Sequence, residues 1–204
     1  MKSVLLSTRP KWCEKICHKI GTDKNGKPIY EKSIEVRKTK PSIPTPFKAF
    51  IYMTKKKPYM LTFAGNGKMR VHNGMVIGEF ICDKVEEFSV GSLRSDDIEK
   101  LACLSYSEMI DYFYKPEELD GKTRKYGYGW HISQLKIYDK PKELSEFRKP
   151  LDRVWGSYCS DYCDPGCISF GSTDYSCNDY WDWEKGLTRP PQSWCYIQEL
   201  EEKK

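Results

Sequence analysis

Three charged residues, Lys32, Glu35 and Arg37, have types and spacing that could do chemistry together. In a β-strand, residues two apart point to the same side, so Glu35 and Arg37 would share one face. Lys32 is an odd number of residues from both, and joins them only if the strand begins near Ser33 or the chain bends there. A carboxylate between two cations is costly to bury unless it is paired or contacts a ligand. The pattern fits a ligand site, and it also fits a salt bridge on a surface strand.

The residues upstream of this pattern predict a strand followed by a helix. Val4–Leu6 is a short apolar run typical of a buried strand. Pro10 suits the first turn of a helix, where its missing N–H is not needed. Trp12, Ile16 and Ile20 follow at helical spacing and predict one apolar face.

The rest of the chain predicts further strands, short helices and loops. Asn25-Gly26 is a tight-turn signal, so the excursion at about residues 21–30 is expected to be a small hairpin. Residues 115–129 are polar and contain three glycines, which favours a loop beside the site. We expect strands at 47–53, 69–71, 75–82 and 134–138, an extension of the same sheet at 84–90, helices at 96–103 and 107–114, and a helical turn at 142–147.

The order of strand, Ser7-x-Arg9-Pro10, helix and Lys32-x-x-Glu35-x-Arg37 resembles the opening of the ASCH domain, a branch of the PUA-like fold. The signature of that family is Gly-x-Lys-x-x-Glu-x-Arg, and Tyr30 stands here in place of the glycine. The resemblance continues through segments 76–82 and 129–138, and segment 189–197 is similar to the closing segment of phage or prophage ASCH proteins.

The resemblance implies an α+β fold with a small PUA-like β-barrel and flanking helices. It also implies one domain over residues 1–204, with insertions at about 21–30, 90–128 and 151–187, the last of them rich in aromatic residues and cysteine. The length of 204 residues agrees, because it suffices for one compact domain with a real core.

The function that the resemblance implies first is binding of RNA or of a modified nucleoside or nucleotide in a cationic cleft. Lys32 and Arg37 would contact a phosphate or a base edge, and Glu35 would accept from a base amino group or hold Arg37 in place. The other residues expected to line or close this cleft are Ser7, Arg9, Trp12, Trp130, His131, Gln192, Ser193 and Trp194. The basic stretch 38–70, interleaved with aromatics, fits a nucleic-acid groove and also an ordinary solvated face.

The resemblance also leaves an enzymatic and an interaction hypothesis open. Small relatives of this fold resemble amidohydrolases that remove the acetyl group of N4-acetylcytidine with the lysine matched here by Lys32, although they carry threonine at the position of Glu35. A desolvated lysine beside another cation can act as base or nucleophile, with Glu35 or Glu79 relaying the proton. Some ASCH proteins are described as ribonucleases, and the same residues would serve that chemistry. The third hypothesis is a phage protein that binds a host protein through its aromatic insertion.

Nine cysteines require a further hypothesis. No cofactor is expected apart from a structural zinc ion. Its candidate ligands are spaced C-x3-C-x3-C-x9-C, and four thiolates can close a tetrahedral site: Cys159, Cys163, Cys167 and Cys177. Free thiols and a disulfide are the alternatives, of which the disulfide is less expected in a chain without a signal peptide.

Composition and charge exclude some classes of protein. A hydrophobic content of 39% with 14% aromatic residues is typical of a globular protein and not of a disordered chain. No apolar run approaches the roughly 20 residues of a membrane span, so we expect no membrane association and a cytoplasmic location. The net charge of +5 is a modest bias that is compatible with an anionic partner.

Overall fold

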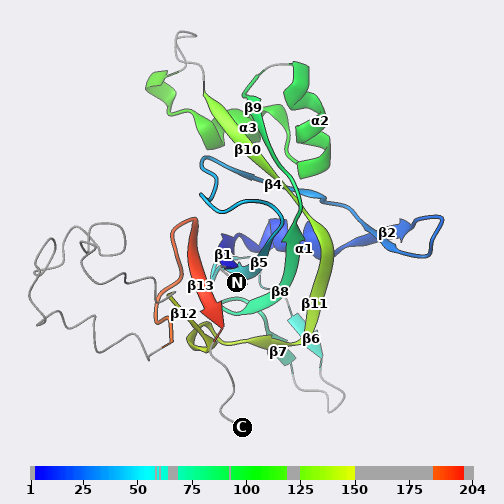
Figure 1. The fold of residues 1–204 in the computed structure, drawn as a ribbon, viewed down its shortest axis with the longest axis vertical. Coiled ribbons are helices and arrows are strands. Elements are labelled where there is room, and N and C mark those ends of the chain that lie inside the picture. The colour runs from blue at the N-terminus through cyan, green and yellow to red at the C-terminus, as the bar shows by residue number, and fades with distance from the viewer. Residues whose placement is uncertain are drawn as a thin grey trace, which may run out of the picture.

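The computed structural model describes residues 3–57, 59, 61–63, 69–91, 93–118, 125–149 and 186–199. The largest sheet runs across the middle and the lower part of Figure 1 and has six strands. In spatial order they are β11 (Ser133–Lys142), β8 (Val76–Cys82), β5 (Phe47–Met53), β1 (Ser3–Thr8), β13 (Trp194–Glu199) and β12 (Phe147–Arg148). The central β1 and β5 are parallel and nearly all their residues are buried, as expected for strands covered on both faces.

A second sheet with three antiparallel strands lies at the other end of the molecule (Figure 1). Its order is β4 (Ile34–Arg37), β10 (Tyr126–His131) and β9 (Val85–Ser89). Two small antiparallel hairpins complete the strands: β2 (Lys19–Thr22) with β3 (Pro28–Tyr30), and β6 (Leu61–Phe63) with β7 (Met69–Val71). The first of these hairpins projects from the body of the protein in Figure 1.

The helices are short, and the starts of α1 and α3 follow from their sequences. In α1 (Pro10–Cys17), proline occupies the first turn. In α3 (Tyr106–Phe113), Ser105 caps the amino terminus and forms a capping box with Glu108. The others are α2 (Leu93–Ala102) and the 3-10 turns η1 (Pro116–Glu118) and η2 (Leu144–Glu146). No helix within the described residues has the length and apolar character needed to cross a membrane.

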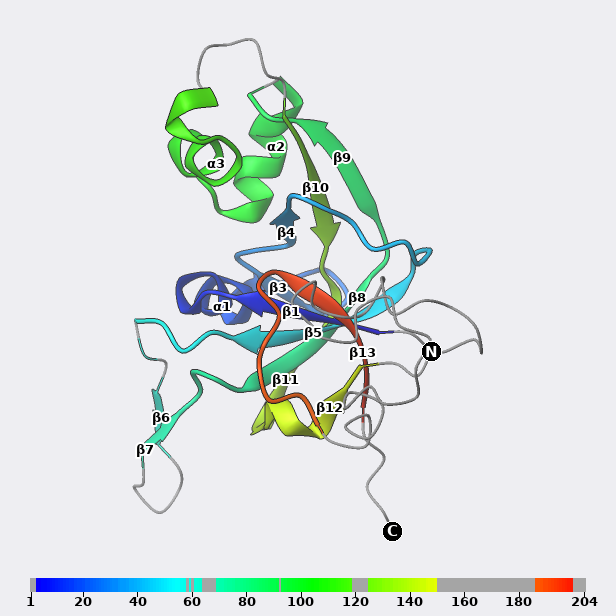
Figure 2. The same cartoon turned by 90° about the vertical axis from the view of Figure 1, so that its left-hand side faces the viewer.

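The six-stranded sheet separates two hydrophobic cores, because successive side chains of each strand point to opposite faces. Val4 and Leu6 point into the core shared with α1 and Trp130, whereas Leu5 points into the core formed with Phe147. Figure 2 shows α1 beside β1 and β5, next to β4. A third core lies between the three-stranded sheet and the helices α2 and α3. The two sheets therefore face each other across the first core as an open barrel with few helices, which confirms the α+β prediction.

Several expected elements form as the sequence predicted. The strand at 47–53 has the predicted bounds. The hairpin at 21–30 forms around Gly26, whose φ of 79° lies in the left-handed region that glycine adopts without strain. Both predicted helices of the second insertion are present, and the turn after residue 141 is η2.

Three expectations about single elements were wrong. Ile20 does not continue the apolar face of α1, because that helix ends at Cys17 and Ile20 lies in β2, 58% exposed. Residues 84–90 do not extend the sheet of β8, because β9 pairs with β10. The expected loop at 115–129 instead ends in strand β10, which begins at Tyr126.

Candidate functional site

The chain bends before β4 and so brings Lys32 to the side of the strand that holds Glu35 and Arg37. Ser33 marks the bend: its N–H donates to the Leu101 carbonyl at 2.9 Å, and its carbonyl accepts from Ile132. The strand then begins at Ile34. This is the start that the sequence required if Lys32, Glu35 and Arg37 were to lie on one side. Lys32 lies outside the strand, so the alternation of the strand does not direct its side chain away.

The three charged side chains form a buried triad centred on the Glu35 carboxylate. Arg37 Nη2 lies 2.8 Å from one carboxylate oxygen, Oε1, and Lys32 Nζ lies 3.3 Å from the other, Oε2. The side chains of Lys32, Glu35 and Arg37 are only 2%, 8% and 7% exposed. The salt bridge on a surface strand, one of the two interpretations of the sequence, is therefore wrong, because these charges lie out of solvent.

Lys32 is held at the carboxyl end of α2. Its Nζ donates to the Ala102 carbonyl at 2.6 Å, where the helix dipole favours a cation. The same ammonium lies 5.3 Å from the centre of the Trp12 ring. Burial lowers the pKa of Lys32 from its ordinary value, and the neighbouring carboxylate of Glu35 opposes that shift. Lys32 therefore loses its proton more easily than an exposed lysine.

Arg37 joins β4 to the other sheet. Its Nη2 donates to the Ser7 carbonyl and to Thr8 Oγ1, both at 3.1 Å. Its Nη1 lies 3.4 Å from the Ser193 carbonyl, in the segment that precedes β13. Its Nε is buried and has no hydrogen-bond partner among the described residues. Arg37 thus has one N–H that is not used by any acceptor in the part of the chain that the structure describes.

Trp130 adds a second unpaired donor on the same face. It lies opposite Glu35 in the β10–β4 register, so both side chains point to one side of the sheet. The indole is fully buried and packs against Phe47 and Trp194, with ring centres 5.4 and 5.9 Å apart. Its Nε1 has no hydrogen-bond partner among the described residues. A buried N–H without an acceptor costs about 1–3 kcal/mol, so two of them on the face of the sheet that holds Glu35 require a reason.

The rim of the triad includes residues that the sequence did not single out. Tyr112 of α3 is 38% exposed. Burial raises its pKa, with Arg37 opposing that shift and Glu35 adding to it, so the phenol lies within electrostatic reach of the triad. Lys11 of α1 pairs with Glu108 of α3 and ties the two helices together beside it. The only sequence signal for Tyr112 was its place on a short amphipathic helix.

The other predicted cleft residues divide into those near the triad and those away from it. Ser7 and Ser193 touch Arg37 through their carbonyls, and the Ser7 hydroxyl donates to the Pro191 carbonyl at 2.6 Å. Trp194 contacts Trp130 and donates its Nε1–H to Thr39 at 2.9 Å. Trp12 contacts Lys32, as described above. Arg9 and Gln192 are exposed on the two segments that flank this region.

The structure does not bring His131 or Glu79 to the triad. His131 follows Trp130 in β10 and so points to the opposite face, where its Nε2 lies 3.3 Å from Glu86. Glu79 lies on the far face of the six-stranded sheet and accepts a hydrogen bond from Tyr138 at 2.6 Å. Tyr52, one of the aromatic residues of the basic stretch 38–70, is only 2% exposed and belongs to the core of that far face.

The zinc hypothesis concerns Cys159, Cys163, Cys167 and Cys177, which lie outside the described residues, as does the aromatic insertion that contains them. Among the residues that the structure describes, no three His, Cys, Asp or Glu side chains are grouped as metal ligands. Cys13 lies beside the triad, and burial raises the pKa of its thiol well above the ordinary value. It is therefore a core thiol that donates to the Thr8 carbonyl.

Comparison with known proteins identifies the fold. No protein-family model matches this chain, and no curated protein matches it. The crystal structure of ASCH from Zymomonas mobilis is similar over 70% of this chain and 73% of its own, with 18% identity and a TM-score of 0.46. A serine-to-alanine variant of the same protein matches over 96% of this chain and 88% of its own, with 15% identity and a TM-score of 0.51. The latter likeness shows that this chain has the fold of an ASCH domain, as the order of its elements predicted.

Proposed function

We propose that the triad of Lys32, Glu35 and Arg37 is the floor of a site that binds the base of an RNA or of a modified nucleotide. The observation that carries this proposal is that two buried donors on the face of the sheet that holds Glu35, Arg37 Nε–H and Trp130 Nε1–H, have no partner among the described residues. The ASCH fold supports the same class of ligand, because PUA-like domains resemble RNA-binding modules.

The donors and acceptor of the triad match the edge of a nucleobase. Arg37 and Trp130 offer two N–H groups to carbonyl oxygens or ring nitrogens of a base. A carboxylate has about four lone-pair sites, and the two cations occupy one on each oxygen of Glu35. The remaining sites would accept from an exocyclic amino group. A base that carries both an acceptor and an amino donor, such as cytosine, therefore fits better than a bare phosphate.

Entry of a base requires a side chain of the rim to move. Lys32 is 2% exposed, so the floor is covered in this conformation. The partly exposed residues around it are Trp12 of α1, Tyr112 of α3 and Ser193 before β13. Aromatic side chains at a rim can stack on an unpaired base, which would compensate for their displacement.

Arg37→Lys tests the proposal most simply, because it keeps the positive charge beside Glu35 and removes the unpaired Nε–H. Hydrogen bonds to charged groups contribute about 1.5–3 kcal/mol, so the affinity for a bound nucleoside is expected to fall by roughly 10- to 100-fold. Cytidine and N4-acetylcytidine would be titrated by calorimetry against wild type and variant. Arg189→Lys, at an exposed position, is the matched control. Equal affinity of the two variants would refute the assignment, as would the absence of nucleoside binding to wild type.

Hydrolysis of an N4-acetylated base is the second candidate, and the lowered pKa of the buried Lys32 favours it. A neutral Lys32 would take a proton from the water whose oxygen bonds to the acetyl carbonyl carbon. The resulting ammonium would return that proton to N4 as the C–N bond breaks, which releases acetate and restores the amino group of the base. Glu35 contacts Lys32 directly, whereas Glu79 lies on the other face of the sheet. Lys32→Arg separates the two functions, because arginine keeps the charge and stays protonated. Turnover of N4-acetylcytidine by wild type but not by the variant would establish the hydrolase.

A further inference from the structure

A second group of basic residues lies on the far face of the six-stranded sheet, away from the triad. It lines an open groove of about 570 Å³ between the edge strand β11 and its neighbours. Four lysines and two carboxylates contribute charge to this groove, so its balance is positive. Its principal lining residues are Lys48, Glu79, Lys136, Tyr138, Lys140 and Lys142.

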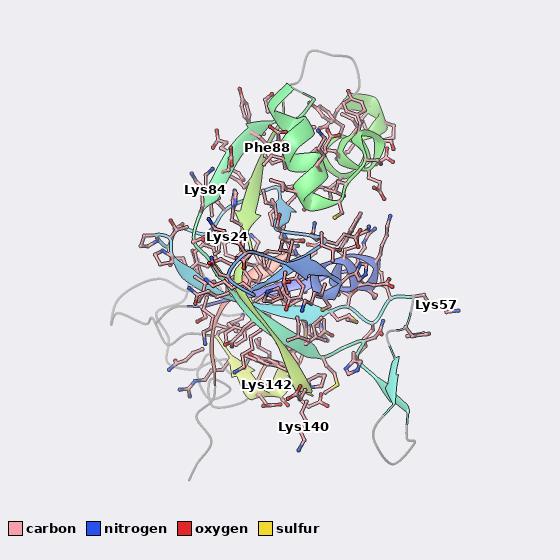
Figure 3. All side chains as sticks on the ribbon, turned by 90° about the vertical axis from the view of Figure 1, so that its right-hand side faces the viewer. Lys24, Lys57, Lys84, Phe88, Lys140 and Lys142 are labelled. Carbon is pink, nitrogen blue, oxygen red and sulfur yellow. The ribbon has the colours of Figure 1, made fainter. Side chains whose placement is uncertain are left out.

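An irregularity in β11 explains why so many of its residues line the groove. The pairing of β11 with β8 shifts register between Ile137 and Lys142, so the regular alternation of side chains is interrupted there. The consecutive residues from Lys136 to Lys140 therefore all contribute to the groove, together with Lys142. Lys140 and Lys142 lie in Figure 3 at the opposite end of the molecule from Phe88.

The contacts within the groove favour phosphate groups over bases. Lys136 and Lys142 lie 6.0 and 5.4 Å from the centre of the Tyr138 ring. A base that stacked on this ring would therefore lie close to two ammonium groups. The Tyr138 hydroxyl is already bonded to Glu79, which also lies 3.4 Å from Lys48. Lys136 and Lys140 are exposed on the edge strand. The groove therefore presents a ligand with a cluster of lysine side chains, of which Lys136 and Lys140 are exposed.

We infer that this groove binds the phosphodiester backbone of a single-stranded nucleic acid, as a site separate from the triad. The inference does not depend on base recognition by Arg37 and Trp130, since none of the groove residues touches them. The alternative is that the lysines only protect the edge of the sheet from pairing with another strand. The two explanations predict different effects of removing the lysines on the salt dependence of oligonucleotide binding.

The test compares Lys136→Gln/Lys140→Gln with wild type, using a fluorescein-labelled oligouridylate of roughly 12 nucleotides and its deoxythymidylate counterpart. Binding is measured by anisotropy over a range of salt concentrations. Log K falls with log salt, and each lost phosphate contact on a single strand makes this slope less steep by about 0.7. The slope of the double variant should therefore be less steep than that of wild type by about 1.4. At about 0.1 M salt this corresponds to roughly 25-fold weaker binding. Asp139→Asn, which removes a carboxylate of the groove, should tighten binding.

The matched control is Lys24→Gln/Lys27→Gln in the projecting hairpin, which changes the net charge equally on two exposed lysines. Lys24 lies well apart from Lys140 in Figure 3. Equal slopes for the two double variants would overturn the inference and leave edge protection as the role of the lysines. Binding of RNA but not of DNA would also overturn it, because backbone phosphates alone do not distinguish them.

The same titrations separate this inference from the proposed function. An uncharged nucleoside reports only on the triad, and the Lys136→Gln/Lys140→Gln variant should bind it as wild type does. Nucleoside binding without oligonucleotide binding would refute the groove and leave the triad proposal standing. Oligonucleotide binding that depends on these lysines, without nucleoside binding, would support the groove and refute the triad proposal.

Discussion

Replacing Glu35 with glutamine tests whether the triad is a truly buried charge cluster. The change keeps the shape of the side chain but leaves the Lys32 and Arg37 cations, at 3.3 and 2.8 Å, without their shared anion. Removing one partner of a buried ion pair costs about 3–5 kcal/mol, because a charge remains uncompensated out of water. The Glu35 carboxylate forms ion pairs with two cations, so we expect Glu35→Gln to lower the free energy of unfolding by an amount in this range.

The loss should depend on pH in a direction fixed by Lys32. Burial holds the pKa of Lys32 in the folded protein below its ordinary value of 10.5. Between those two pKa values the unfolded chain binds more protons, so the free energy of unfolding rises with pH. Without Glu35 the folded pKa falls further, and this window extends to lower pH. The deficit of the variant should therefore shrink as the pH rises through this added window, up to the folded pKa of Lys32 in the wild type, which lies below 10.5.

Urea denaturation followed by tryptophan fluorescence, at about pH 7 and about pH 9.5, measures both effects. Glu31→Gln is the matched control, because Glu31 also contacts two basic residues, Lys15 and His18, but is far more exposed. It should lose much less stability, since exposed ion pairs contribute little. A Glu35→Gln loss no larger than that of the control would show that the triad is solvated and refute the reasoning. So would a deficit that grows with pH.

Three further predictions concern the frame around the site. Ser105→Ala removes the hydroxyl that accepts from the Glu108 N–H and should cost about 1 kcal/mol in urea denaturation, whereas no change would mean that water replaces the cap. Gly78→Ala places a Cβ 2.5 Å from the Lys136 carbonyl and should cost about 1–3 kcal/mol, and wild-type stability would contradict the close approach of β8 and β11. Burial raises the pKa of Cys82 to about 12, so iodoacetamide at about pH 8 should label it, by peptide mass spectrometry, only after unfolding.

The parts of the fold that were predictable are those in which local signals agree with packing. The strand at 47–53 was correct because its nearly continuous apolar run suits a central strand covered on both faces. Helix α3 was correct because a serine cap and Glu108 mark its start. The bend before β4 followed from requiring three charged residues on one side of a strand.

The errors arose where the tertiary neighbours decide the structure. Gly127 was taken as a sign of a loop, yet it lies within β10. A Cβ at this position would come within 2.5 Å of Phe113 and 2.6 Å of Phe88. The glycine reports close packing of a helix on the sheet, which no local pattern reveals. The pairing of β9 with β10 was not foreseen either, because the choice of partner strand also depends on the tertiary structure. The burial of the triad and the role of the Ala102 carbonyl depend on α2, which is distant in sequence.

The most direct test of base recognition by the triad is to observe its two unpaired donors while a nucleoside is added. In a ¹⁵N-labelled sample, the indole signal of Trp130 is identified by its loss in Trp130→Phe, and the Nε–H signal of Arg37 by its loss in Arg37→Lys. On titration with cytidine or N4-acetylcytidine, both signals should shift together and saturate at one affinity, because both donors gain the same acceptor-bearing ligand. If the ligand binds while both signals stay in place, the triad is not the base-binding site.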